Sequence, residues 1–160
     1  MSSEDFIPTP GPLMDLGPRT RAILGVHMLF RKIEEQLEAL STEPALTKPE
    51  RHLLVVLSQP TRMGALAQEL QTVPSSITAI ADSLEAKGLI GRQRDPDDRR
   101  AWRLFLTEDG QRLRHWMADR AAAIFTEATG LPDDDIDTLA RLLAEVSEAP
   151  YRSIDCAGEI

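Results

Sequence analysis

The feature that most constrains this sequence is a predicted β-hairpin over residues 89–107, folded around the turn Asp95-Pro96-Asp97-Asp98. Pro fixes φ, and an Asp side chain can hydrogen-bond its own backbone, so this tetrapeptide favours a turn. Apolar and other residues alternate from Ala101 to Leu106, which is the period of a strand. Arginines lie on both arms and beside the turn. The hairpin therefore presents guanidinium groups, whose fork geometry matches phosphate oxygens and base-edge acceptors.

Two short helices are predicted directly before the hairpin. Apolar spacing predicts one over Gly64–Gln71 and a second over Pro74–Lys87, which Gly88 can terminate. On their own, two such helices are more often a simple helical hairpin than a DNA-reading unit. A basic hairpin placed after them is the order of a winged helix-turn-helix, in which the second helix enters the major groove.

Longer helices are predicted on either side of this part. Apolar residues form one helical seam from Ile23 to Leu40, and others do so over residues 113–125 and 136–146. Thr47 and Glu50 have the spacing of a capping box, which predicts a helix start. Thr107 can cap the helix that follows the hairpin.

The net charge of −8 is unusual for a DNA-binding protein, but it is unevenly distributed. Residues 127–160 carry a net charge of −7, whereas residues 44–106 carry +2. A mildly basic reading surface is compatible with this asymmetry. The start of the chain has no apolar segment of a signal peptide, and no apolar run approaches a membrane span. We therefore expect a cytoplasmic protein.

The run from Leu66 to Gly110, and above all GLI-x-R-x-x-DP-x-DRR ending in LT-x-x-G over Gly88–Gly110, resembles the MarR family of bacterial winged-helix regulators. The resemblance covers most of residues 20–148. It implies a homodimer built from the first and last helices, a pseudo-palindromic operator, and release by small aromatic or phenolic effectors. It predicts a mainly α-helical winged helix-turn-helix protein with long terminal dimerisation helices and a two-stranded β wing.

The predicted organisation has five segments. They are a flexible arm (1–18), dimerisation helices (19–43 and 108–148), a winged helix-turn-helix (44–107) and a flexible tail (149–160).

The resemblance also implies which residues contact DNA. The DNA-binding candidates on the second short helix and the wing are Ser75, Ser76, Thr78, Ala79, Arg92, Arg94, Asp98, Arg99 and Arg100. In the family's Asp-x-Arg pair, Asp98 would brace the loop and Arg100 would enter the minor groove, although Arg99 is an alternative to Arg100. The sequence departs from the family at Val73, where a capping Ser is common, and at Ala79, where a basic residue is common.

An effector pocket is expected where the dimerisation helices meet the reading domain. Candidate residues, which mix apolar area with a few polar groups, are His27, Met28, Arg31, His52 and Trp116. Ordinary core and interface packing is the alternative for each of them.

Other chemistry is not predicted. The three histidines, at positions 27, 52 and 115, lack a metal-ligand spacing, so no metal is expected. No nucleophile–base or paired-carboxylate arrangement occurs, and neither does a phosphate-binding Gly-rich loop, so we expect neither an enzyme nor a cofactor. Cys156 lies beside Asp155, which opposes thiolate formation, so redox sensing is not predicted.

The sequence thus predicts a homodimeric transcriptional regulator that binds double-stranded DNA, with repression favoured over activation. The alternative is a winged-helix protein-interaction module that uses an acidic surface and does not bind DNA. Neither the operator, the regulated genes nor the effector follows from the residues.

Overall fold

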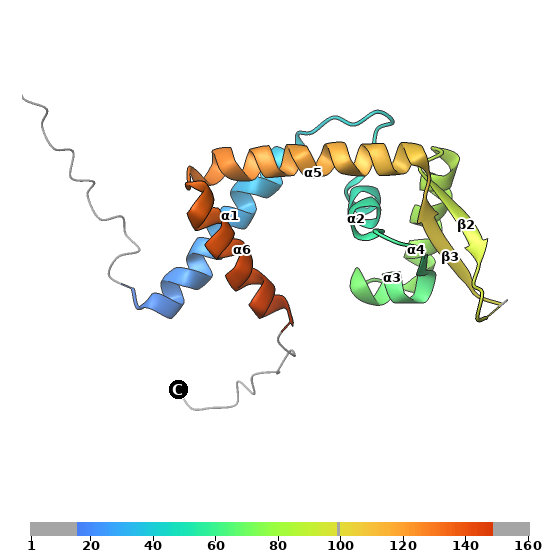
Figure 1. Ribbon diagram of the computed structural model, residues 1–160, viewed down its shortest axis with the longest axis horizontal. Coiled ribbons are helices and arrows are strands. Elements are labelled where there is room, and N and C mark those ends of the chain that lie inside the picture. The colour runs from blue at the N-terminus through green and yellow to red at the C-terminus, as the bar shows by residue number, and fades with distance from the viewer. Residues whose placement is uncertain (1–15, 99, 149–160) are drawn as a thin grey trace, which may run out of the picture. The chain divides into compact units, whose positions relative to one another are not determined.

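The computed structural model describes residues 16–98 and 100–148. Within them it contains six helices and three short strands (Figure 1). The bounds are α1 Pro18–Glu38, α2 Lys48–Val56, β1 Thr61–Arg62, α3 Met63–Glu69, α4 Pro74–Ala86, β2 Ile90–Arg94, β3 Trp102–Leu106, α5 Glu108–Thr129 and α6 Asp133–Glu148. The chain divides after Ala128 into two compact units. The predicted mainly α-helical winged-helix fold is confirmed. Residues 1–15 of the predicted arm (1–18) and the predicted tail over 149–160 lie outside the described residues.

The helix starts follow the sequence signals. Thr47 Oγ1 accepts a hydrogen bond from Glu50 N at 3.5 Å, and Thr47 N donates to Glu50 Oε2 at 2.6 Å, which completes the predicted capping box. Helix α4 ends as expected, because Gly88 adopts φ +71°, a conformation that suits glycine.

The core of the first unit lies in the winged-helix part of the chain. Its largest fully buried apolar side chains come from α2, the turn after it, α3, α4 and β3, and they are Leu53, Leu54, Leu57, Leu66, Ile77, Leu84 and Leu104. The buried Met117 and the partly buried Leu113 connect α5 to this core. Tight leucine packing of this kind fixes the position of α4 relative to the strands, which is the geometry a reading helix needs.

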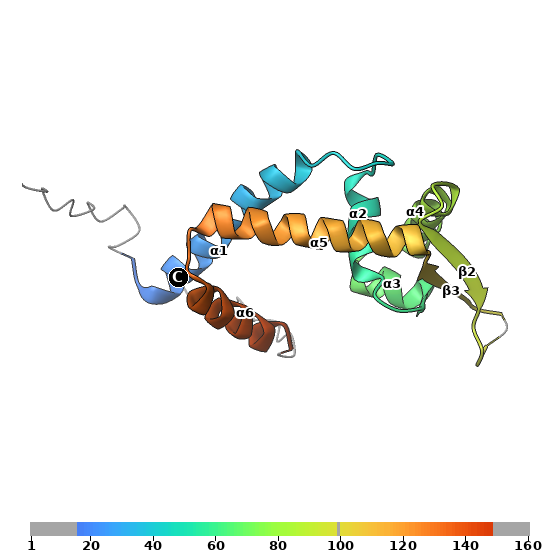
Figure 2. The ribbon, with the colours of Figure 1, turned by 45° about the horizontal axis from the view of Figure 1, so that its top comes forward.

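The sheet has three antiparallel strands in the order β1-β3-β2, and its hairpin of β2 and β3 is the predicted two-stranded wing. The third strand, β1, pairs Thr61 with Leu104 and Arg62 with Arg103. Two residues are too short to show the alternation by which a strand is recognised, and only the pairing defines this one. Figure 2 shows β2 and β3 extending beyond α3 and α4 as a wing.

The LT-x-x-G motif joins the wing to α5. Thr107 Oγ1 donates to Gly88 O at 2.7 Å and accepts from Gly110 N at 3.1 Å, and Thr107 N donates to Leu89 O at 3.1 Å. A Cβ atom on Gly110 would lie 1.9 Å from Leu89 O. Only glycine allows the backbone of α5 to approach the start of the wing so closely.

Candidate nucleic-acid interface

Helix α4 has the two faces that a reading helix needs. Ile77, Ala81 and Leu84 are buried in the core, whereas Ser75, Thr78 and Ala79 are exposed and Ser76 is half-buried. Residues three and four apart share one face of a helix, so Ser75, Thr78 and Ala79 lie together on the outer face. The structure therefore leaves this face free for a partner.

The departure at Val73 has a structural consequence. Val73 occupies the N-cap of α4 without a side-chain cap, because its side chain has no hydrogen-bonding atom. The first turn instead closes through its backbone, since Ser76 N donates to Val73 O at 3.0 Å. Thr78 Oγ1 donates to Pro74 O at 3.1 Å. The start of α4 thus exposes hydroxyl and methyl groups rather than charges.

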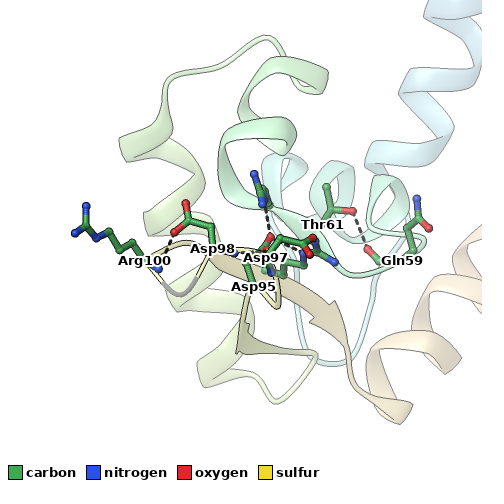
Figure 3. A network of polar contacts seen from close by, with 8 residues as sticks. Gln59, Thr61, Asp95, Asp97, Asp98 and Arg100 are labelled. Carbon is green, nitrogen blue, oxygen red and sulfur yellow. Dashed lines mark hydrogen bonds and ion pairs between the residues drawn. The ribbon is translucent and has the colours of Figure 1, made fainter.

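The wing is held at the start of its turn by Asp95, directly after β2. This residue is 1% exposed, and its Oδ2 atom accepts hydrogen bonds from Arg62 Nε at 2.5 Å and Arg103 Nε at 2.6 Å. Its Oδ1 atom accepts from the backbone nitrogens of Asp97 at 2.8 Å and Asp98 at 3.1 Å. Figure 3 shows Asp95 within this network. This one carboxylate therefore connects the turn of the wing to strand β3 and to Arg62, the residue that precedes α3.

The electrostatics of Asp95 follow from these contacts. The hydrogen bond from Arg62 lowers the pKa of the Asp95 carboxyl well below its usual range, against the effect of burial, and Arg103 and the two backbone donors lower this pKa further. The carboxylate is therefore charged at every pH at which the protein is expected to work. The turn of the wing therefore stays braced under all such conditions.

At the tip of the wing, Asp98 Oδ1 accepts a hydrogen bond from Arg100 N at 3.0 Å. Figure 3 shows the Arg100 side chain pointing away from the network around Asp95. Arg99, the alternative to Arg100, lies outside the described residues. The guanidinium carbon of Arg94 lies 4.0 Å from the centroid of the Trp102 ring, a cation–π contact across the two strands.

Arg92 lies against α4, whereas Arg100 lies at the tip of the wing. Its guanidinium pairs with Asp82 of α4, and its Nε atom lies 3.5 Å from Glu85 Oε2. The side chain is 26% exposed. A guanidinium held against two carboxylates is less available to a phosphate than an exposed one. The structure thus gives Arg92 a role in orienting the wing relative to α4, and DNA contact by it stays a prediction.

A second buried carboxylate orients α4. Glu50 of α2 is 3% exposed, and its Oε1 atom accepts hydrogen bonds from Lys87 Nζ and Ser83 Oγ, both at 2.6 Å. Burial alone would raise the pKa of Glu50, but the hydrogen bonds from Lys87, Ser83 and Thr47 together lower it to about 2. This charged group links α2 to the C-terminal half of α4.

Sequence reasoning missed the roles of Asp95 and Arg62. Asp95 was predicted only as a turn residue, and the Asp-Pro pair gives no indication of burial. Arg62 lies 33 residues earlier in the chain and has no local signature. Glu50 was predicted as a capping residue, and its contacts with α4 were not.

A pocket of about 530 Å³ lies between α1, α2 and α5. Apolar lining residues include Phe30, Ile33, Leu37, Val55 and Met117, and polar ones include Lys48, Arg51 and His52. Of the five effector candidates, only His52 lines this pocket.

The other four candidates are exposed and lie outside the pocket lining. They are His27, Met28, Arg31 and Trp116. The residues of α1 that line the pocket lie in the C-terminal half of that helix, from Phe30 to Glu38. Trp116 precedes the inward-facing Met117, and one residue turns a helical side chain by about 100°. A contact between these four residues and an effector stays a prediction.

Within the described ranges, no group of three or more His, Cys, Asp or Glu side chains could hold a metal ion. Cys156 lies outside those ranges. None of the helices in the described part of the chain combines the length and the apolar composition that crossing a bilayer requires.

A helix-turn-helix followed by a braced basic hairpin defines a winged-helix DNA-binding protein. The model of the MarR family matches residues 46–102. The chain is 30% identical over 138 residues to the uncharacterized HTH-type transcriptional regulator YpoP of Bacillus subtilis, covering 81% of this chain and 96% of that protein. It is 26% identical over 129 residues to the HTH-type transcriptional repressor MdtR of the same species, covering 79% and 83%.

The fold agrees with these matches. The crystal structure of Streptococcus pneumoniae FabT in complex with DNA aligns with a TM-score of 0.60 at 21% identity, over 81% of this chain and 94% of that one. The chain belongs to the MarR family, and it is a DNA-binding transcriptional regulator.

Proposed function

We propose that this protein represses transcription as a homodimer that occupies a pseudo-palindromic operator. The proposal of a dimer is supported chiefly by the exposure of α1. No residue of this 21-residue helix is buried, and its seam leaves Ile23 69%, Val26 58% and Phe30 59% exposed. Contiguous apolar faces of this kind are rare on monomeric proteins, because water contact is unfavourable.

Helix α6 of the second unit has the same property. Residues 133–146 include no buried side chain, and Leu142 and Val146 are 47% and 72% exposed. A second copy of the chain would cover both helices with matching apolar surfaces, as a two-fold interface requires. Two copies of α4 would then read two related half-sites about one DNA turn apart.

Within each half-site we assign base-edge contacts to Ser75, Ser76, Thr78 and Ala79 of α4. Arg94 and Arg100 would contact the DNA backbone or the minor groove from the wing, with Asp98 holding the tip. The DNA complex of FabT supports the use of this fold for DNA binding. The name of MdtR, a repressor, supports repression. Membership in the family disfavours the alternative of an interaction module that does not bind DNA.

Half-site spacing tests this proposal. An operator selected from a random duplex library should be a pseudo-palindrome, and inserting about 5 bp between its halves should remove most of the affinity, because it turns one half-site to the opposite side of the duplex. Ile23→Glu should dissociate the dimer in sedimentation and weaken operator binding, whereas Ile23→Leu should do neither. Affinity that is unaffected by spacing would show that two protomers do not read the duplex together.

We further propose that the pocket between α1, α2 and α5 binds a small aromatic or phenolic effector. Its apolar walls suit a ring, and Arg51 and His52 can meet a carboxylate or phenolate. The pocket is lined by α2, which Glu50 connects to α4, so an occupant that shifts α2 would also shift the reading helix.

Salicylate, a phenolic carboxylate, serves as the probe for this pocket. Titration calorimetry should detect its binding, and bound probe should release the operator. Ala118→Phe should fill the pocket and abolish both effects. Ala122→Phe places the same side chain at an exposed position of α5 that does not line the pocket, and it should abolish neither. Equal binding by the two variants would place the ligand elsewhere.

A further inference from the structure

The start of α4 exposes methyl groups and no charge. Val73, at the N-cap, is 58% exposed, and Thr78 and Ala79 are exposed one turn further on. No residue from Val73 to Ala81 is charged. The bidentate Arg or Lys contacts by which reading helices recognise guanine cannot be made from this segment.

Two of the polar groups near these methyl groups, those of Thr78 and Asp82, are already engaged. The hydroxyl proton of Thr78 is donated to Pro74 O at 3.1 Å, so this side chain offers DNA its methyl group and an acceptor oxygen. Asp82, the first charged residue of α4, is paired with Arg92. Its negative charge is thereby balanced on the side that would face the duplex. Besides the hydroxyls of Ser75 and Ser76, the groups left to distinguish between bases are therefore the methyl groups of Val73, Thr78 and Ala79.

We propose that Val73, Thr78 and Ala79 read thymine through apolar contacts with its 5-methyl group in the major groove. Each operator half-site then contains thymines opposite the start of α4. Thymine is the base that presents a methyl group in the major groove, so a methyl-rich surface distinguishes it from the other bases. This inference rests on the proposed function, because it requires α4 to lie in that groove.

The test removes only the methyl group from the DNA. An operator is first selected from a random duplex library with the full-length protein. Each thymine of a half-site is then replaced in turn by uracil, which keeps the same hydrogen-bonding atoms. At one or more positions the substitution should weaken binding about fourfold, the effect expected for one buried methyl-sized group.

Protein variants assign the effect to the named residues. Val73→Ala removes two exposed methyl groups, and Thr78→Ser removes one while keeping the hydroxyl that bonds Pro74 O. Each variant should bind the thymine operator more weakly and lose the difference between thymine and uracil at its own position. Arg100→Ala is the control. It should weaken binding to both operators and leave their affinity ratio unchanged, because it acts from the wing.

The outcomes separate this inference from the proposed function. If no sequence is enriched in the selection, operator binding itself fails. If an operator is enriched but every uracil substitution leaves the affinity of the wild-type protein unchanged, thymine reading is wrong and operator binding stands. A thymine preference that persists in both Val73→Ala and Thr78→Ser would show that these side chains do not carry it.

Discussion

The winged-helix part of the chain and its terminal helices bury their apolar residues in opposite ways. From α2 to β3, fully buried leucines converge on one core, and two buried carboxylates, Glu50 and Asp95, are each held by several donors. Helix α1 contains no buried residue, and residues 133–146 of α6 contain none either. These helices have apolar seams of their own, but no seam residue is buried and several remain exposed.

The two parts of the chain therefore differ in whether contacts within one chain or contacts between two copies stabilise them. The winged-helix part obtains its stability from contacts within one chain, so its unfolding should depend little on protein concentration. The terminal helices expose the surface that a second copy would cover, so their order should depend on association.

The largest effect is expected for Gly110→Ala. The new Cβ atom would lie 1.9 Å from Leu89 O and 2.9 Å from Leu89 C, so backbone must move where α5 meets the wing. The free energy of unfolding, measured in urea, should fall by about 3 kcal/mol or more. The decrease should be the same at low and high protein concentration, because the clash lies within one chain.

Gly64→Ala is the matched control for this substitution. Gly64 lies in α3 with no atom within 4 Å of an added Cβ. Alanine there should stabilise the protein by up to about 1 kcal/mol, because it favours the helix. A similar decrease in stability in both variants would indicate that crowding at Leu89 is not the cause.

Glu50→Gln should have the next largest effect. It removes the charge that Lys87 and Ser83 bind, and it should lower the free energy of unfolding by about 2–3 kcal/mol at neutral pH. Folding lowers the pKa of Glu50 from 4.5 to about 2. The charged form therefore stabilises the fold fully above pH 4.5, and this contribution disappears as the pH falls toward 2.

The pH dependence distinguishes this mechanism from a simple packing defect. The difference between wild type and Glu50→Gln should shrink as the pH falls, because the wild-type carboxyl becomes protonated. Glu69→Gln, at an exposed position of α3, should change stability by less than about 0.5 kcal/mol at any pH. A constant difference down to pH 2 would exclude the charge of Glu50 as the cause.

Much of the fold could be predicted because its signals are local. Three such signals are the capping box of Thr47 and Glu50, the turn that contains Pro96 and the glycine after α4. Each involves only a few neighbouring residues and indicates one local structure. Helix α4 itself was predicted from apolar spacing over Pro74–Lys87, and the residues with that spacing, Ile77, Ala81 and Leu84, are buried. Residues this close in sequence meet in the same way in almost any context.

The remaining features depend on contacts between distant residues. Arg62 and Asp95 meet only because β1 joins β3, and a two-residue strand has no pattern of its own. The prediction that Arg92 contacts DNA took no account of Asp82, with which the structure pairs it. The pocket lining depends on the rotation of α1 and α5, which their apolar seams constrain too loosely to distinguish Trp116 from Met117.

The smallest effect on folding, and a clear effect on binding, is expected for Arg100→Ala. Arg100 is exposed at the tip of the wing and points away from the network around Asp95 (Figure 3), so its removal should leave the free energy of unfolding unchanged. Operator affinity should fall for nearly all sequences, and its salt dependence should flatten by about 0.9 in log–log slope for each phosphate that the variant no longer neutralises. Ser75→Ala, on the uncharged face of α4, should keep the slope and alter preference at particular base pairs by about 1–3 kcal/mol. Wild-type affinity and slope in folded Arg100→Ala would show that Arg100 does not supply the electrostatic anchor of the wing, and Arg94 would then be the next arginine to replace.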